Sequence, residues 1–257
     1  KPASKIYTGI IMLFLFAPII ILLVFSFNEA KSLSVYSGFS LNWYKELFKD
    51  AETLNAVRNT LVLAVSAALI STVMGTAAAV GINKLRNRYL RWAMDTVTNI
   101  PMINPDIITG ISLMLLFLFT KVERGYVTML LAHITFDTPY VILSVLPKLK
   151  QMNKHSYEAA LDLGATPTYA LFHVILPEIM PGVITGAMLA FTLSLDDFTI
   201  SYFTTSPLVQ NLSTLIYSQA RKGIKPTMNA LSALMFVALL LLLLVVNRRS
   251  SKTEVKN

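Results

Sequence analysis

Hydrophobic residues along this chain gather into long uninterrupted runs instead of alternating with polar ones. A helix needs about 20 apolar residues to cross the hydrocarbon core of a bilayer. Six runs come near this length: residues 6–27, 60–82, 92–119, 127–146, 183–203 and 228–246. The pattern predicts an all-α membrane protein with six transmembrane helices, organised as one domain over residues 1–257.

The third run is the least regular of the six. It contains Pro101, Pro105 and Asp106, so that only residues 107–119 are continuously apolar. Because proline interrupts the hydrogen bonds of a helix, we expect a broken span whose freed backbone groups need polar surroundings.

The first run follows Lys1 and Lys5, as the apolar part of a signal peptide follows its basic residues. It is longer than the roughly 7 to 15 apolar residues of a signal peptide. Residues 28–30 also make a poor cleavage site. We therefore interpret the run as a retained anchor.

Outside the runs, residues 28–59 form the longest polar segment on the predicted outer side. Residues 42–48 within it predict a short amphipathic helix at the outer surface, with Trp43 and Tyr44 suited to the interfacial aromatic belt. Inside the second run, small residues recur every fourth position and favour close helix packing: Ser71, Gly75 and Ala79.

The composition agrees with a membrane protein. Hydrophobic residues make up 54% of the chain and charged residues 14%, against about 25% charged in soluble domains. With both termini in the cytoplasm, more than half of the 22 Lys and Arg residues fall in cytoplasmic segments, as the positive-inside rule requires. The exception is an outer basic cluster of Arg221, Lys222 and Lys225. We therefore expect a multi-pass protein of the cytoplasmic membrane, whose net charge of +8 reflects topology and not nucleic-acid binding.

The polar segment between the fourth and fifth runs, residues 147–182, carries its own helix signals. Residues 153–163 are strong helix formers, and Gly164 suits the left-handed conformation that ends a helix. Thr166 and Pro167 then predict an N-cap followed by a helix-starting proline.

A second short helix is expected through residues 175–177. We call residues 153–177 the knob. The knob is too short to bury a core of its own and lies between membrane spans on the cytoplasmic side. It is therefore expected to fit a cleft in a partner protein.

Within the knob, Glu158-Ala159-Ala160, Gly164 and Leu176-Pro177 occur at a defined spacing. This spacing resembles the signature loop of permease subunits of ATP-binding-cassette (ABC) importers. Where the usual pattern has Ile before the Leu-Pro pair, this chain has Val174 followed by Ile175, a conservative departure. The resemblance implies the type I importer permease fold, with residues 147–182 as the cytoplasmic coupling-helix loop. The residues implied to couple to the ATPase are Glu158, Ala159, Ala160, Gly164, Leu176 and Pro177.

Five carboxylates fall inside the apolar runs. Asp95 stands at the start of the third run near Arg91, and we expect it at the inner surface without a role in transport. The other four are Asp106, Asp137, Asp196 and Asp197. A carboxylate at the bilayer centre is costly unless it is paired or hydrated. On one helix Asp196 and Asp197 would project about 100° apart and form a broad acidic wall in the outer half of the membrane. These positions favour a pathway for a cation.

Other interpretations of single residues remain open. Asp137 suits either this pathway or a cap or hydrogen-bond partner in a helix bent at Pro139. Asp106 suits either the pathway or a cap of the helix after Pro105. The three histidines lack metal-ligand spacing and indicate packing or surface positions: His133, His155 and His173.

Four further segments resemble the permease subunits of spermidine and putrescine importers: residues 104–107, 133–136, 158–165 and 191–197. The resemblance implies a location in the bacterial cytoplasmic membrane and three kinds of partner: a second permease subunit, a pair of cytoplasmic ATPase subunits and an extracytoplasmic polyamine-binding protein. On this hypothesis the ammonium groups of the polyamine follow Asp106, Ser194, Asp196 and Asp197, with Trp43 as a cation-π surface.

The chain itself shows no nucleotide-binding loop. It lacks the Gly-x4-Gly-Lys-Ser/Thr pattern, and residues 223–225 lack the required spacing. With no cysteine there is no thiolate metal site or cysteine nucleophile. We therefore expect a transport subunit and no enzyme, without a cofactor of its own, whose partner ATPase subunits bind ATP and Mg²⁺. The alternatives are a permease for another cationic or small solute, an ion-coupled secondary carrier and a membrane scaffold.

Overall fold

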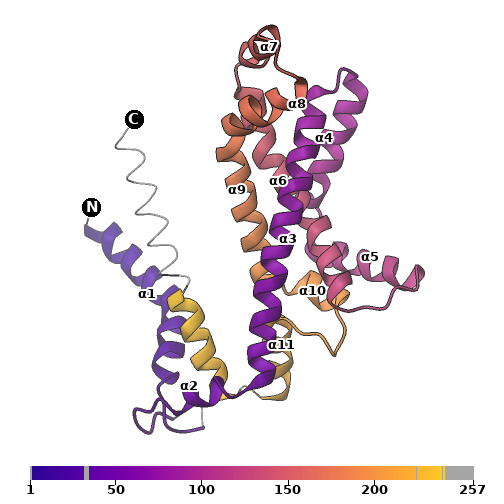
Figure 1. Ribbon diagram of the computed structural model, residues 1–257. Coiled ribbons are helices and arrows are strands. Elements are labelled where there is room, and N and C mark those ends of the chain that lie inside the picture. Colours follow the sequence, from indigo (N-terminus) through magenta and orange to yellow (C-terminus); the bar gives the residue numbers. More distant parts are fainter. Residues whose placement is uncertain (1, 32–34, 224, 239, 241–257) are drawn as a thin grey trace. The chain divides into compact units, whose positions relative to one another are not determined.

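The computed structural model describes residues 2–31, 35–223, 225–238 and 240 (Figure 1). Nearly all ordered segments in these ranges are helices, and the extended backbone among them amounts to an isolated bridge between Asn28 and Phe39. The all-α prediction is confirmed.

The chain divides into two compact units. Unit 1 comprises Lys1–Leu54 and Ile216–Asn257, and unit 2 comprises Asn55–Leu215. The boundaries fall inside two helices, α3 (Ala51–Lys84) and α11 (Leu212–Lys222). The single permease domain stays a prediction, and each unit is described by itself.

Unit 1 contains α1 (Pro2–Phe25) and α2 (Asn42–Leu47). The large apolar side chains of α1 are mostly exposed, as expected for an anchor in lipid. Helix α2 confirms the predicted short helix of the outer segment.

The sixth predicted run begins in unit 1 as the helix Pro226–Ala238. Residues 241–246 of this run lie outside the described residues. So do several basic residues used to predict the orientation: Lys1, Arg248, Arg249, Lys252 and Lys256.

Unit 2 is built around α6 (Tyr126–Gln151) and α9 (Leu176–Asp196), which run side by side (Figure 1). Glycines permit this approach, because a Cβ atom on Gly186 would lie 3.2 Å from Val141 of α6. Gly75 of α3 meets the same residue, with a built Cβ only 2.7 Å from the Val141 side chain. Val141 is thus enclosed between two glycines, and the close packing predicted at Gly75 is confirmed.

The third run forms two helices, α4 (Arg88–Ile103) and α5 (Asp106–Phe119), which meet at an angle of 108°. The break falls at Asn104 and Pro105, where the Asn104 side chain donates a hydrogen bond to Thr109 Oγ1 at 3.1 Å. The predicted break is confirmed, but the two halves do not form one straight span.

The fifth run differs most from its prediction. A four-residue helix α8 (Pro167–Ala170), a π-helical turn η1 (Leu171–Ile175) and α9 follow one another without a gap. They form one helical segment, Pro167–Asp196, so the predicted separate helix through residues 175–177 is wrong. The π turn widens the helix locally, and it comes directly before Leu176 and Pro177, where proline cannot donate to the helical hydrogen-bond ladder. The helix ends at Asp196, short of residue 203, and a separate helix α10 (Thr199–Thr204) follows.

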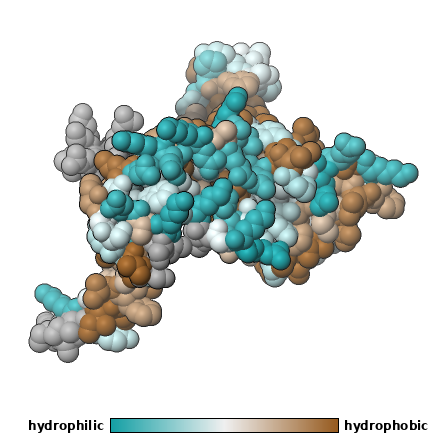
Figure 2. Space-filling view, turned by 90° about the horizontal axis from the view of Figure 1, so that it is seen from below, coloured by the Kyte–Doolittle hydropathy of each residue, from teal (hydrophilic) through white to brown (hydrophobic). Residues whose placement is uncertain are grey.

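Within the part of the chain that the structure describes, four helices are long and apolar enough to cross a membrane alone, and the bent pair of α4 and α5 is a fifth candidate. Helix Pro226–Ala238 falls on the sixth run. Figure 2 shows many hydrophobic side chains, in brown, exposed at the surface. Such exposure is what a chain surrounded by lipid requires.

Candidate functional site

The end of α9 brings the predicted acidic pair into two different environments. Asp197 has extended backbone (ψ 125°), and its carboxylate accepts hydrogen bonds from the backbone N–H groups of Ile200 at 3.2 Å and Ser201 at 2.7 Å. Its side chain is 8% exposed. Asp197 therefore acts as an N-terminal cap of α10. The predicted acidic wall, with both carboxylates on one helix, is wrong because the helix stops between them.

Asp196 is the exposed member of the pair. Its backbone carbonyl accepts a hydrogen bond from Ser213 Oγ at 3.3 Å. The last residue of α9 thus presents a charge beside a helix break. We call residues 196–198 the α9 break.

Asp106 is also exposed and lies at a break, in the first turn of α5. Pro105 occupies the N-cap position of α5 and Asp106 the first helical position, so the capping alternative is not supported. One turn further along α5, Gly110 packs against α10, where a Cβ would meet Phe203 at 3.0 Å. The packing of α5 on α10 therefore places Asp106 in the same part of unit 2 as the α9 break.

Behind the α9 break lies a buried polar network that sequence reasoning did not find. It comprises His133 and Asp137 of α6, Ser194 of α9, Ser201 of α10 and Asn211, each with a relative exposure of 0%. The spacing of four residues between His133 and Asp137 places both on one face of a helix. That spacing was the available signal, but it does not tell which partners the two side chains meet.

The contacts of the network run from α6 to the start of α11. Ser194 donates a hydrogen bond to Asp137 Oδ2 at 2.6 Å and lies 3.1 Å from His133 Nδ1. The other ring nitrogen, His133 Nε2, lies 3.0 Å from Ser201 Oγ and 3.6 Å from Asp197 Oδ2. Asn211 donates to Ser201 Oγ at 2.7 Å. Asp137 is thus a hydrogen-bond partner, and Ser194 is buried in the network instead of lining an open path.

Trp43 does not offer its ring to a cation in this structure. The residue is 5% exposed, and its indole N–H donates a hydrogen bond of 2.7 Å to the Asn28 carbonyl within unit 1. A buried, hydrogen-bonded indole is a packing residue. We therefore leave Trp43 out of the pathway.

The knob has the local structure that its sequence predicts. Helix α7 (Lys154–Asp162) starts at Asn153, whose side chain accepts a hydrogen bond from the backbone of His155. The helix ends in a Schellman motif, with Gly164 at φ +90° and two closing bonds of 2.9 and 3.0 Å. Thr166 then caps α8 through the N–H of Tyr169.

The Gly164 turn bounds a surface hollow of about 490 Å³. Its lining includes Ala160 and Leu163, and Leu163 is 90% exposed. Glu158 and Ala159 are exposed on the same short helix, whereas Leu176 packs on the core of the helices and Pro177 is exposed at the start of α9. The residues predicted to couple to the ATPase therefore lie in two places within the knob: on α7 and its closing turn, and at the start of α9.

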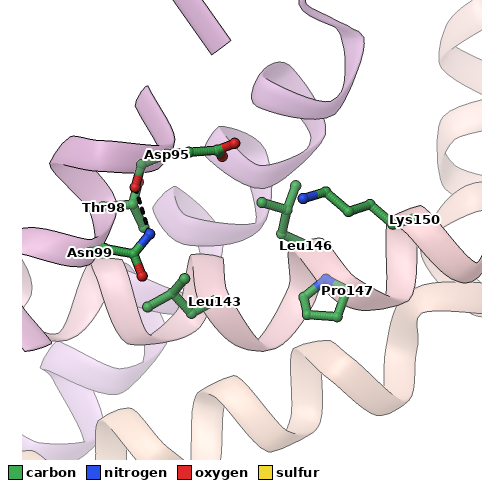
Figure 3. Close-up of a pocket in the computed structure, with 7 residues that line it drawn as sticks. All are labelled: Asp95, Thr98, Asn99, Leu143, Leu146, Pro147 and Lys150. Carbon is green, nitrogen blue, oxygen red and sulfur yellow. Dashed lines mark hydrogen bonds between the residues drawn. The ribbon is translucent and has the colours of Figure 1, made fainter. Parts of the chain in front are cut away.

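A second cavity, of about 230 Å³, lies between α4 and α6 (Figure 3). Asp95, Thr98 and Asn99 come from α4, and Lys150 is the charged residue from α6. A larger hollow of about 310 Å³ shares Asp95 and Lys150 and also contains Arg91. Asp95 thus lies near Arg91, as expected from the sequence. Among the described residues no group of His, Cys, Asp and Glu could hold a metal ion.

Residues 71–250 match the family of binding-protein-dependent transport system inner membrane components. The chain belongs to this family. Members are transport components, so the permease is not an enzyme.

Its relatives include the Escherichia coli K12 putrescine transport system permease protein PotI, 39% identical over 88% of this chain and 82% of the relative. The spermidine/putrescine transport system permease protein PotC is 36% identical in E. coli K12, covering 90% and 87% of the two chains. PotC of Haemophilus influenzae is 34% identical over 94% and 95%. The resemblance to this group, drawn from four sequence segments, is confirmed.

Solved structures confirm the fold of the permease. A bacterial ABC transporter for alginate import superposes with a TM-score of 0.77 at 14% identity, covering 96% of this chain and 94% of the other. The methionine ABC transporter MetNI gives a TM-score of 0.65 at 19% identity, covering 78% and 95%. Both are ABC transporters, so the type I importer permease fold is confirmed.

Proposed function

We propose that this permease forms half of a translocation pathway that carries polyamines, spermidine or putrescine, across the cytoplasmic membrane. The observation that carries the proposal is the pair of exposed carboxylates at helix breaks, Asp106 and Asp196. Exposed carboxylates attract ammonium groups, and the names of relatives between 34% and 39% identical point to the same cargo.

The proposed assembly contains a second permease subunit, two cytoplasmic ATPase subunits and an extracytoplasmic polyamine-binding protein. ATP and Mg²⁺ bind to the ATPase subunits, and this chain supplies no cofactor site. Both termini and the knob lie in the cytoplasm. In this orientation the exposed Leu163 and the hollow at Gly164 face the ATPase subunits.

The continuous helix from α8 to α9 gives this assembly a mechanical connection. Pro167–Asp196 spans 30 residues, which at 1.5 Å per residue is about 45 Å. One end carries the knob and the other carries the α9 break. Movement of the knob when the ATPase subunits close on ATP therefore displaces Asp196, and the pathway alternates between outward-facing and inward-facing states. The carboxylates need to attract the cation without retaining it.

The test is uptake of labelled spermidine and putrescine by the assembled complex in sealed vesicles. ATP is compared with a non-hydrolysable analogue, and Asp196→Asn is compared with the exposed variant Glu123→Gln between α5 and α6. We expect uptake that needs hydrolysis and that falls in Asp196→Asn alone.

Two results would redirect the proposal. Uptake that persists without hydrolysis and stops when the ion gradient collapses would indicate a secondary carrier. Absence of polyamine uptake in a complex that still hydrolyses ATP would indicate another cargo.

A further inference from the structure

The buried network behind the α9 break has one consistent arrangement of hydrogens for a neutral histidine. Ser194 has one hydroxyl hydrogen and donates it to Asp137, so His133 Nδ1 carries the hydrogen that points at Ser194. His133 Nε2 then accepts from Ser201, whose oxygen in turn accepts from Asn211. Every donor in this series of hydrogen bonds has an acceptor, and His133 is the central residue of the series.

His133 joins three helices through polar contacts at both of its ring nitrogens. Its ring joins α6 to Ser194 on α9 and to Ser201 on α10. Ser201 is also one of the two backbone donors to the Asp197 carboxylate. The residues on either side of the α9 break are therefore both held by one imidazole ring on the neighbouring helix.

The network lies in apolar surroundings, where packing alone does not explain why its side chains are polar. An apolar cluster of α5, α6 and α10 lies close by, including Phe117, Phe136 and Ile200. Buried polar groups in such a setting cost free energy unless they are fully hydrogen-bonded. Here Asp137 Oδ1 has no hydrogen-bond partner among the described residues. An apolar set of side chains would serve packing at least as well.

We propose that His133 is a positioning residue for transport: with Asp137 it holds the α9 break in the conformation that directs the Asp196 carboxylate into the cation pathway. This inference rests on the proposed function and adds a residue that does not touch the cargo. His133 Nε2 lies 3.0 Å from Ser201 Oγ and 3.6 Å from Asp197 Oδ2, so the ring also lies beside the carboxylate that caps α10.

The experiment uses the assembled complex and a thiol reporter at the site. The chain contains no cysteine, so Thr192→Cys adds a single one to it. Thr192 is exposed and lies one helical turn before Asp196 on α9. The ratio of its labelling rates with a cationic and an anionic thiol reagent of equal size measures the local negative potential. Mass spectrometry assigns the label to this subunit, and Asp196→Asn calibrates the ratio expected when the carboxylate is lost.

In this background His133→Phe removes both hydrogen bonds while it fills the space of the ring. Val141→Ala is the matched control, because Val141 is equally buried on α6 and takes no part in the network. We expect His133→Phe to move the labelling ratio toward that of Asp196→Asn and to lower uptake by about tenfold. In Val141→Ala we expect thermal stability to fall while the ratio stays at the wild-type value.

The proposal is overturned if His133→Phe keeps the wild-type labelling ratio, or if uptake in both variants falls only in proportion to thermal stability. Should His133→Phe not assemble, Ser201→Ala removes a single link of the network and must shift the ratio in the same direction. Labelling requires no transport. An unchanged labelling ratio in His133→Phe, together with polyamine uptake by the unsubstituted complex, therefore refutes the positioning role alone. A shifted ratio in His133→Phe, together with no polyamine uptake by the unsubstituted complex, refutes the proposed cargo alone.

Discussion

Gly164 offers the sharpest test of the knob because its substitution changes backbone energy and little else. The residue adopts φ +90°, and an added Cβ would have no atom within 4 Å. Any effect of Gly164→Ala therefore comes from conformation and not from a clash. Holding a residue with a Cβ in the left-handed region costs about 1–2 kcal/mol.

That free energy acts on the turn between α7 and α8, where the two closing hydrogen bonds of 2.9 and 3.0 Å depend on the left-handed residue. A cost of one to two kcal/mol lowers the population of the native turn relative to its alternatives by a factor of about 5–30. We expect polyamine uptake per hydrolysed ATP to fall by up to this factor in Gly164→Ala. The fall should be larger in Gly164→Val, since a β-branched residue tolerates this region least.

The assay compares uptake and ATP hydrolysis in the same vesicles. Gly125→Ala is the matched control, because Gly125 has extended backbone and equally open space around its Cα. Gly164→Asn should retain most of the coupling, because asparagine enters the left-handed region more readily. Wild-type coupling in Gly164→Val would refute the reasoning that the shape of the turn transmits the ATPase movement.

Three further predictions concern packing and charge. Gly75→Ala should lower the free energy of unfolding of the complex by about 1–3 kcal/mol, since its Cβ would lie 2.7 Å from a neighbouring side chain. The control is Gly81→Ala, on the same helix with open space around it, which should not destabilise the complex. Trp43→Phe should lower the melting temperature because it removes a buried hydrogen bond, at about 0.5–1.5 kcal/mol, while uptake per folded complex stays unchanged; a selective loss of uptake would restore Trp43 to the pathway. Asp197→Ala should cost about 0.5–2 kcal/mol as a lost cap, whereas Asp197→Asn should keep most of that stability because its amide oxygen still accepts a backbone hydrogen bond. Equal melting temperatures in the two variants would contradict the capping role.

Local features of the knob followed from the sequence because each depends on near neighbours. A side-chain cap at Asn153, a left-handed glycine and a Thr-Pro helix start need only the few residues around them. The break at Pro105 was predictable for the same reason. The π turn before Leu176 was not, because its position depends on how the segment packs on the α6 side of the core.

The acidic residues show the opposite case. The hydropathy pattern identified four carboxylates inside apolar runs, Asp106, Asp137, Asp196 and Asp197, but it did not distinguish their environments. The structure separates exposed Asp106 and Asp196 from the buried Asp137 and the capping Asp197. Helical periodicity gave the wrong geometry for the adjacent pair, since the chain leaves the helix after Asp196.

The sequence by itself determined the class of protein and the local structure of the knob, because run length, charge bias and capping signals act over a few turns of one helix. Only the tertiary structure decided the fate of His133, which the spacing of histidines in the sequence had indicated as a packing or surface residue. Its partners Ser194 and Ser201 lie 61 and 68 positions away. No local pattern encodes such a meeting, because it depends on α9 and α10 folding back onto α6 on both sides of the α9 break.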